Sequence, residues 1–177
     1  MCYDFFMALG RYHDTFNLAF GAVLSGAMIG FGVETLITVA FSAGWLFSTL
    51  IFGPDSDLTV KRRTQILRYF LWPYSFFFRH RGISHHFFWG TLSRNIYLLI
   101  ILILCMKLVL YFLSLASFEI SVIDAIKTIS PPMKFWFSSE GILFWKFSFF
   151  LFLGQWLSDL AHLAFDKFAD KTGFFYK

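Results

Sequence analysis

"NIYLLIILILCMKLVLYFLSL", residues 95–115, contains a single charged residue, Lys107. A helix needs about 20 mostly apolar residues to cross a hydrocarbon core of roughly 30 Å, and this run meets that requirement. The whole chain of 177 residues is 58% hydrophobic and has a mean hydropathy of +0.64, far from the mixture used by soluble globular domains. The run therefore predicts a transmembrane helix in an all-α, polytopic membrane protein.

The segment 16–51 is also apolar, but it is too long for one crossing. The sequence "GFGVE" (30–34) places two glycines and a charge near its middle. We therefore predict two helices, near 16–32 and 35–52, joined by a tight turn at Glu34.

A fourth span is predicted near 141–161, with a helical continuation to Phe168. The apolar segment 69–78 is short and contains a proline, so we expect it at the membrane interface. Charges and a Pro-Pro pair in 117–140 argue against a further span. The expected organisation is one integral-membrane domain, 1–177, with four transmembrane helices.

Basic residues are distributed unevenly along this predicted topology. The N-terminal segment, the loop between the second and third spans and the C-terminal tail carry 11 of the 15 lysines and arginines. Because cytoplasmic loops are enriched in these residues, we predict that both termini are cytoplasmic, in a bacterial inner membrane. The two cysteines are far apart, with Cys2 near the N-terminus and Cys105 inside an apolar run, so a cysteine-based zinc site is not expected. Any metal must then be bound by histidines and carboxylates.

Histidines and acidic residues gather in four short patches. These are "GRYHD" (10–14), "GPDSD" (53–57), "HRGISHH" (80–86) and "SDLAHLAFD" (158–166), which together hold all five histidines and five of the 11 acidic residues. All four lie on the predicted cytoplasmic side. One metal site at the mouth of a four-helix bundle would account for this sorting.

Each patch also has a simpler explanation. "GRYHD" can cap a helix, and "GPDSD" can form an Asx-turn. Adjacent His85 and His86 must point in different directions, so we expect only His85 to join His80 at an ion, with His86 an acid/base group or a bystander.

The last patch places Asp159, His162 and Asp166 at i, i+3 and i+7, on one face of a mostly apolar helix. Asp159 and Asp166 are about 10 Å apart along the axis, so one ion can hardly bind both directly. The face therefore indicates two ions, or one ion with a carboxylate outside the coordination shell. The simpler alternative is a helix end that emerges into water.

These four motifs, in this order and with the following "GTLSR", resemble a family of metal-binding membrane proteins of unknown function and, more distantly, the YdjM-type membrane-bound metal-dependent hydrolases. The resemblance covers nearly the whole chain apart from 117–140. It implies metal binding by His13, Asp55, Asp57, His80, His85, Asp159, His162 and Asp166.

A mixed imidazole and carboxylate site suits zinc or manganese, as one or two ions, better than magnesium or calcium. Such a centre can activate water to hydrolyse a phosphoester. The expected function is a metal-dependent hydrolase that acts on an amphiphilic, phosphate-bearing substrate at the cytoplasmic membrane surface. The candidates for acid/base catalysis are His86 and Asp57, and those for phosphate binding are Arg79, Arg81 and Arg94.

Two other functions stay open. The protein could store or sense a metal without catalysis, or the metal could serve only to hold the helices together. The arginines of "RYFLWPYSFFFRHR" (68–81) are interleaved with aromatic residues. Beside membrane spans, this mixture favours contact with lipid headgroups, and no nucleic-acid partner is expected.

Overall fold

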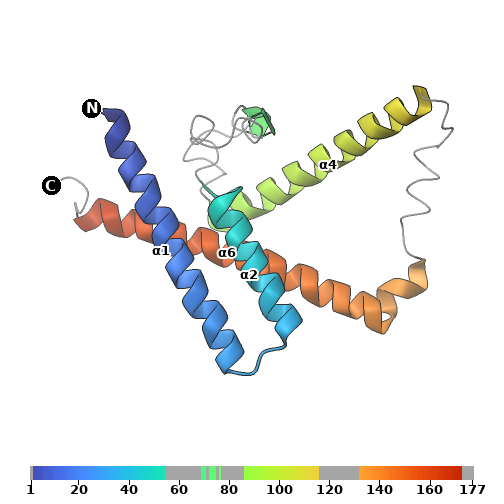
Figure 1. The fold of residues 1–177 in the computed structure, drawn as a ribbon, viewed down its shortest axis with the longest axis horizontal. Helices are drawn as coiled ribbons and strands as arrows, with labels where there is room; N and C mark the ends of the chain where they lie inside the picture. Colours follow the sequence, from blue (N-terminus) through green and yellow to red (C-terminus); the bar gives the residue numbers. More distant parts are fainter. Residues whose placement is uncertain are drawn as a thin grey trace. The chain divides into compact units, whose positions relative to one another are not determined.

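The structure is a computed structural model that describes residues 2–54, 69, 70, 72–74, 76, 86–115 and 132–172, apart from the side chains of 2–13, 114, 115, 133 and 169–172. These residues form helices and contain no strand, which confirms the all-α prediction (Figure 1). The elements are α1 (Cys2–Gly30), α2 (Thr35–Leu50), α4 (Trp89–Leu115), the 3-10 helix η4 (Met133–Phe137) and α6 (Ser139–Thr172).

The chain divides into two compact units. The first combines Met1–Arg94 with Phe147–Lys177, and the second is Asn95–Lys146. The first unit therefore contains α1, α2, the first residues of α4 and most of α6. It also contains the described members of the predicted site.

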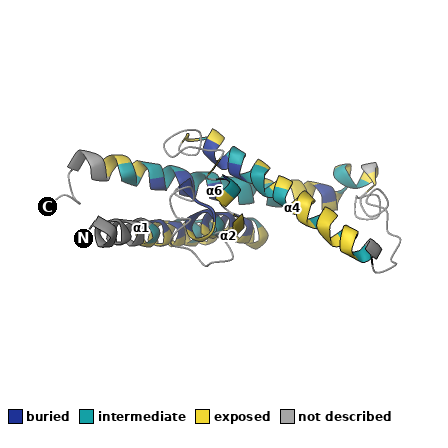
Figure 2. Cartoon of the chain, turned by 90° about the horizontal axis from the view of Figure 1, so that it is seen from above, coloured by how far each residue is buried: buried dark blue, intermediate teal, exposed yellow. Residues whose placement is uncertain are grey.

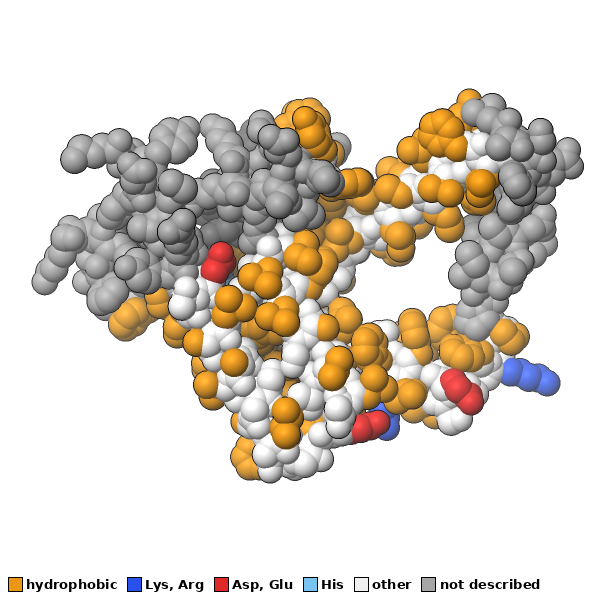
Figure 3. Space-filling view, in the orientation of Figure 1, with side chains coloured by type: hydrophobic (Ala, Val, Ile, Leu, Met, Phe, Trp, Pro, Cys, Tyr) orange, Lys and Arg blue, Asp and Glu red, His pale blue; other side chains and the backbone are white. Residues whose placement is uncertain are grey.

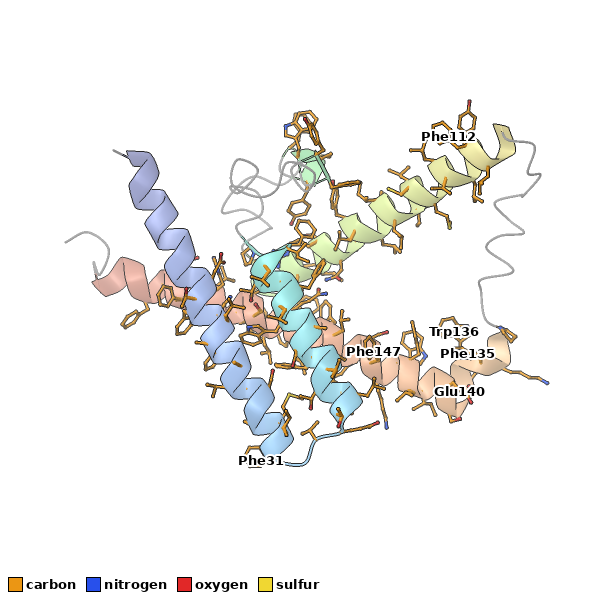
Figure 4. The ribbon with its side chains drawn as sticks, viewed as in Figure 1. Phe31, Phe112, Phe135, Trp136, Glu140 and Phe147 are labelled. Atoms are coloured by element: carbon orange, nitrogen blue, oxygen red, sulfur yellow. The ribbon has the colours of Figure 1, made fainter. Side chains whose placement is uncertain are left out.

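The turn between α1 and α2 lies where the sequence predicts it. Gly32 adopts φ 73°, a left-handed conformation that costs glycine little. The backbone N–H of Val33 donates to the carbonyl of Met28 at 2.9 Å and so satisfies one of the last carbonyls of α1. Phe31 lies at this turn and is 88% exposed (Figure 4).

Helices α2 and α6 approach each other backbone to backbone. A Cβ atom on Gly44 would lie 1.9 Å from the carbonyl oxygen of Leu151, and one on Gly154 would lie 2.1 Å from the carbonyl oxygen of Phe41. No side chain fits at either position. Small residues at the contact are the means by which membrane helices pack closely.

The interior of the first unit is unusually polar. Its fully buried large apolar side chains include Trp45, Phe52 and Tyr74. The buried polar or charged side chains among the described residues are Asn17, Thr38, Ser48, Thr49, Thr91, Arg94, Gln155, Ser158, Asp159 and His162. Soluble domains show the opposite distribution, because they bury apolar side chains and seldom bury charges.

Two helices are long and apolar enough to cross a membrane: Trp89–Leu113 within α4, with a mean hydropathy of 2.8, and Ser139–Phe168 within α6, with 1.2. Only 11% of the first window and 22% of the second are buried, and Figure 2 shows α4 largely exposed. Helix α2 is also apolar but has 16 residues, or about 24 Å. Length and composition thus support two of the four predicted spans; the other two, and the orientation of the termini, stay predictions.

In the second unit, η4 packs on the first turns of α6 through aromatic contacts. The Trp136 ring lies 5.6 Å from Phe144 and 5.5 Å from Trp145, centroid to centroid. The Ser138 hydroxyl donates to the carbonyl of Phe135 at 2.7 Å and accepts from the backbone N–H of Gly141 at 3.2 Å. Figure 4 shows Phe135 and Trp136 at the start of α6. This hydroxyl satisfies one of the free N–H groups in the first turn of α6.

Candidate metal centre

One face of α6 carries the described members of the predicted metal site. His162 is 7% exposed, and its Nε2 atom lies 3.6 Å from Oδ2 of Asp166 one turn further along. The Asp166 side chain is 36% exposed, so the pair lies where this face leaves the interior. A carboxylate beside a ring nitrogen can bind the same ion as the histidine, or it can accept the N–H of the nitrogen that does not bind the ion.

The Asp159 carboxylate lies deeper and has hydrogen-bond donors at both oxygens. The Ser48 hydroxyl donates to Oδ1 at 2.5 Å. The Thr91 hydroxyl and the Arg94 guanidinium both donate to Oδ2. Asp159 and Arg94 form an ion pair in which each side chain is 3% exposed. Three helices, α2, α4 and α6, are thus joined at this one carboxylate.

A second polar cluster extends this network to α1. The Ser158 hydroxyl lies 3.0 Å from that of Thr49, and the Asn17 amide donates to the carbonyl of Ser158 at 3.3 Å. The indole N–H of Trp45 donates to the backbone carbonyl of Asn17 at 2.9 Å. The Oδ1 atom of Asn17 is buried and has no hydrogen-bond partner in the part of the chain that the structure describes.

Half of the eight predicted ligands lie outside the described residues: Asp55, Asp57, His80 and His85. The same holds for the predicted phosphate-binding Arg79 and Arg81. His13 lies in α1, but its side chain is also outside them. Within the described ranges, no group of three or more His, Cys, Asp or Glu side chains is close enough to hold a metal. The predicted ligand set therefore stays a prediction.

The structure also describes two other predicted site residues, His86 and Arg94. His86 is exposed, and its ring centroid lies 5.1 Å from that of Phe87, with the two ring planes tilted by 33°. Arg94 is buried on Asp159, so its guanidinium already has an anionic partner.

Sequence reasoning missed the neutral members of the interior network: Asn17, Ser48, Thr49, Thr91 and Ser158. Their signal was present, since hydroxyls and an amide inside apolar helices are expected to seek partners across helix contacts. The sequence does not reveal which partner each one takes, because that depends on the relative rotation of the helices.

The fold and this face define an all-helical protein that buries polar groups and carries a histidine–carboxylate pair at the edge of its interior. The chain belongs to the family described as uncharacterized metal-binding proteins (DUF2227), whose model matches residues 8–174.

A curated protein of Aquifex aeolicus, named only as an uncharacterized protein, is 41% identical over 63 residues. This similarity covers 34% of the chain and 45% of that relative's length. No solved structure matches the chain significantly.

Proposed function

We propose that this chain is an integral membrane protein that binds a divalent transition metal, zinc or manganese, at the end of α6 marked by His162 and Asp166. The observation that carries the proposal is this pair, with a buried imidazole 3.6 Å from a carboxylate on an otherwise mostly apolar helix. Membership of a metal-binding family supports it independently.

The distribution of side chains supports placement in a membrane. Large apolar residues are exposed along α4, including Leu99, Leu102 and Phe112, and hydrophobic side chains cover much of the visible surface of α1 and α2 (Figure 3). In water this exposure would be costly, at about 25 cal/mol per Å² of apolar surface. In lipid it costs nothing, and the polar interior then provides the hydrogen bonds that lipid cannot.

Two contacts place α1 beside this part of α6. The Phe16 ring stacks on Phe165 at 4.7 Å, and Asn17 bonds to Ser158. His13 precedes Asn17 by about one helical turn. This supports His13 as a third ligand beside His162 and Asp166. We propose that the remaining ligands come from Asp55, Asp57, His80 and His85.

The proposed reaction is hydrolysis of a phosphoester carried by an amphiphilic molecule at the cytoplasmic surface. A bound ion would supply an activated water, and His86 or Asp57 would move the proton. Because Arg94 is paired with Asp159, binding of the phosphate would fall to Arg79 and Arg81. Lipid headgroups are the other anions that these arginines would contact.

Elemental analysis of detergent-purified protein tests metal binding. The wild type should retain zinc or manganese at about one or two ions per chain, and His162→Ala and Asp166→Ala should each lose most of it. Glu140→Ala is the matched control, because it removes an exposed carboxylate from the first turn of the same helix. Wild-type protein without stoichiometric metal, or full metal content in both ligand variants, would refute the proposal.

Hydrolysis is tested with phosphatidic acid and an isoprenyl phosphate in mixed micelles, before and after removal of the metal. Metal-dependent release of phosphate that is lost in His86→Ala, with the metal retained, would support the enzyme. Stoichiometric metal without hydrolysis of either substrate would favour the non-catalytic alternative. Lost metal in His86→Ala would instead make His86 a ligand.

A further inference from the structure

We propose that Asp159 is a positioning residue of this metal centre and does not coordinate the ion. Its pair with Arg94 fixes the rotation and the axial position of α6 relative to the start of α4. These two quantities determine where the His162 and Asp166 side chains lie. This inference rests on the proposed function, because it assigns roles within that site.

The first argument is the occupancy of the carboxylate. Oδ1 accepts from Ser48, and Oδ2 accepts from both Thr91 and Arg94. A divalent ion on Oδ2 would place two more positive charges beside the guanidinium in a buried site, where screening by water is weak. Coordination through Oδ2 would therefore require the Arg94 pair to break, and coordination through Oδ1 would compete with the Ser48 hydroxyl.

The second argument is the direction of the imidazole. The Nε2 atom of His162 faces Asp166, which follows it by one turn, at 3.6 Å. Asp159 precedes His162 by three residues, or about 4.5 Å along the axis, and lies about 10 Å from Asp166. The ion is thus expected at the His162–Asp166 turn, and Asp159 is the carboxylate outside the coordination shell.

The third argument is the number of elements that meet at Asp159. Ser48 comes from α2, and Thr91 and Arg94 come from the first residues of α4. The Gly44 and Gly154 contacts fix the distance between α2 and α6, but small residues allow sliding and rotation. A buried ion pair with additional hydrogen bonds is directional, so it can define the register of α6.

A set of three variants tests the assignment: Asp159→Asn, Arg94→Met, and the two combined. Each single variant leaves one buried charge without its partner, whereas the combined variant removes both charges. Co²⁺ is the probe, because its visible absorption reports the ligands in its shell as well as its binding. Thermal unfolding in detergent is measured alongside.

We expect each single variant to weaken Co²⁺ binding about tenfold or more, as for other residues that orient ligands. The combined variant should recover to within about threefold of the wild type, with an unchanged Co²⁺ spectrum, because no ligand has been removed. A combined variant that folds but binds no Co²⁺, or binds it with an altered spectrum, would make Asp159 a ligand and overturn the inference. So would full Co²⁺ affinity in both single variants.

Ser48→Ala decides the matter if the charge variants do not fold. It removes one hydrogen bond from the Asp159 carboxylate and leaves both charges in place. The Co²⁺ spectrum should keep its shape if Asp159 is outside the shell, and should shift if the carboxylate coordinates. Wild-type protein that binds no Co²⁺ would instead refute the proposed function, which separates the two failures.

Discussion

The two parts of α4 differ sharply. In its first residues, Thr91 and Arg94 are buried and both bond to Asp159. From Asn95 onward the same helix exposes large apolar side chains at nearly every turn, such as Leu99, Ile103 and Leu108. One continuous helix thus buries Thr91 and Arg94 at its start and exposes most of its large apolar side chains further on.

The proposed placement in a membrane accounts for this difference. In water, the hydrophobic effect would bury the leucines and leave the arginine exposed. When the surroundings are lipid, apolar burial gains little, and polar groups must find partners inside the protein. On this placement, hydrogen bonds and an ion pair to Asp159 hold the first part of α4, whereas the second part contacts lipid.

The strongest test of this contrast is Arg94→Met. It leaves the Asp159 carboxylate buried without its cation, and the expected loss is about 3–5 kcal/mol in the free energy of unfolding. Lys107→Met makes the same change in the exposed part of α4 and should be neutral or stabilising. Equal losses in the two variants, measured by unfolding in mixed micelles, would remove the distinction.

Gly154→Ala should have the next largest effect. The added methyl would lie 2.1 Å from the Phe41 carbonyl oxygen, so α2 and α6 must separate, at a cost of about 1–3 kcal/mol. Gly26→Ala is the control, because no atom lies within 4 Å of a Cβ at that position. It should stabilise α1 slightly, since alanine is the better helix former. Comparable melting temperatures for the two variants would mean that the close contact is absent.

A smaller loss is expected for Trp45→Phe. The indole N–H donates to the carbonyl of Asn17, and its removal, with part of the ring, should cost about 1–2 kcal/mol. The exposed Trp89 offers the matched replacement, Trp89→Phe, which should change stability by less than about 0.5 kcal/mol. A larger loss of stability for Trp89→Phe than for Trp45→Phe would mean that Trp45 does not lie in a packed interior.

The smallest effect is expected at Leu102, which is 66% exposed. Leu102→Ala should change the free energy of unfolding by less than about 0.5 kcal/mol, because no packed neighbour is lost. The same substitution in a soluble core would cost about 2–5 kcal/mol. A loss of that size here would show that this part of α4 packs against protein.

The sequence was informative where a local pattern determines structure. The apolar run 95–115 is helical within α4, and the break near Glu34 is the observed turn after Gly32. The shared face of His162 and Asp166 also follows from helical spacing.

The interior partners could not be predicted in the same way. The sequence indicates phosphate binding for Arg94 and does not reveal its pair with Asp159, which is 65 residues away. That pairing depends on how α4 and α6 meet, which no local pattern encodes. The neutral donors Ser48 and Thr91 were missed for the same reason.

The turn between α1 and α2 has a consequence for biogenesis. Only residues 31–34 separate the two helices, and the Ser25 and Ser42 hydroxyls lie 2.8 Å apart across the hairpin. Four residues span at most about 14 Å, so the two helices stay close together from their synthesis onward. On the predicted placement of α1 and α2 in a membrane, we expect the two helices to leave the translocation machinery together as a closed hairpin, with these hydroxyls already bonded to each other before they meet lipid.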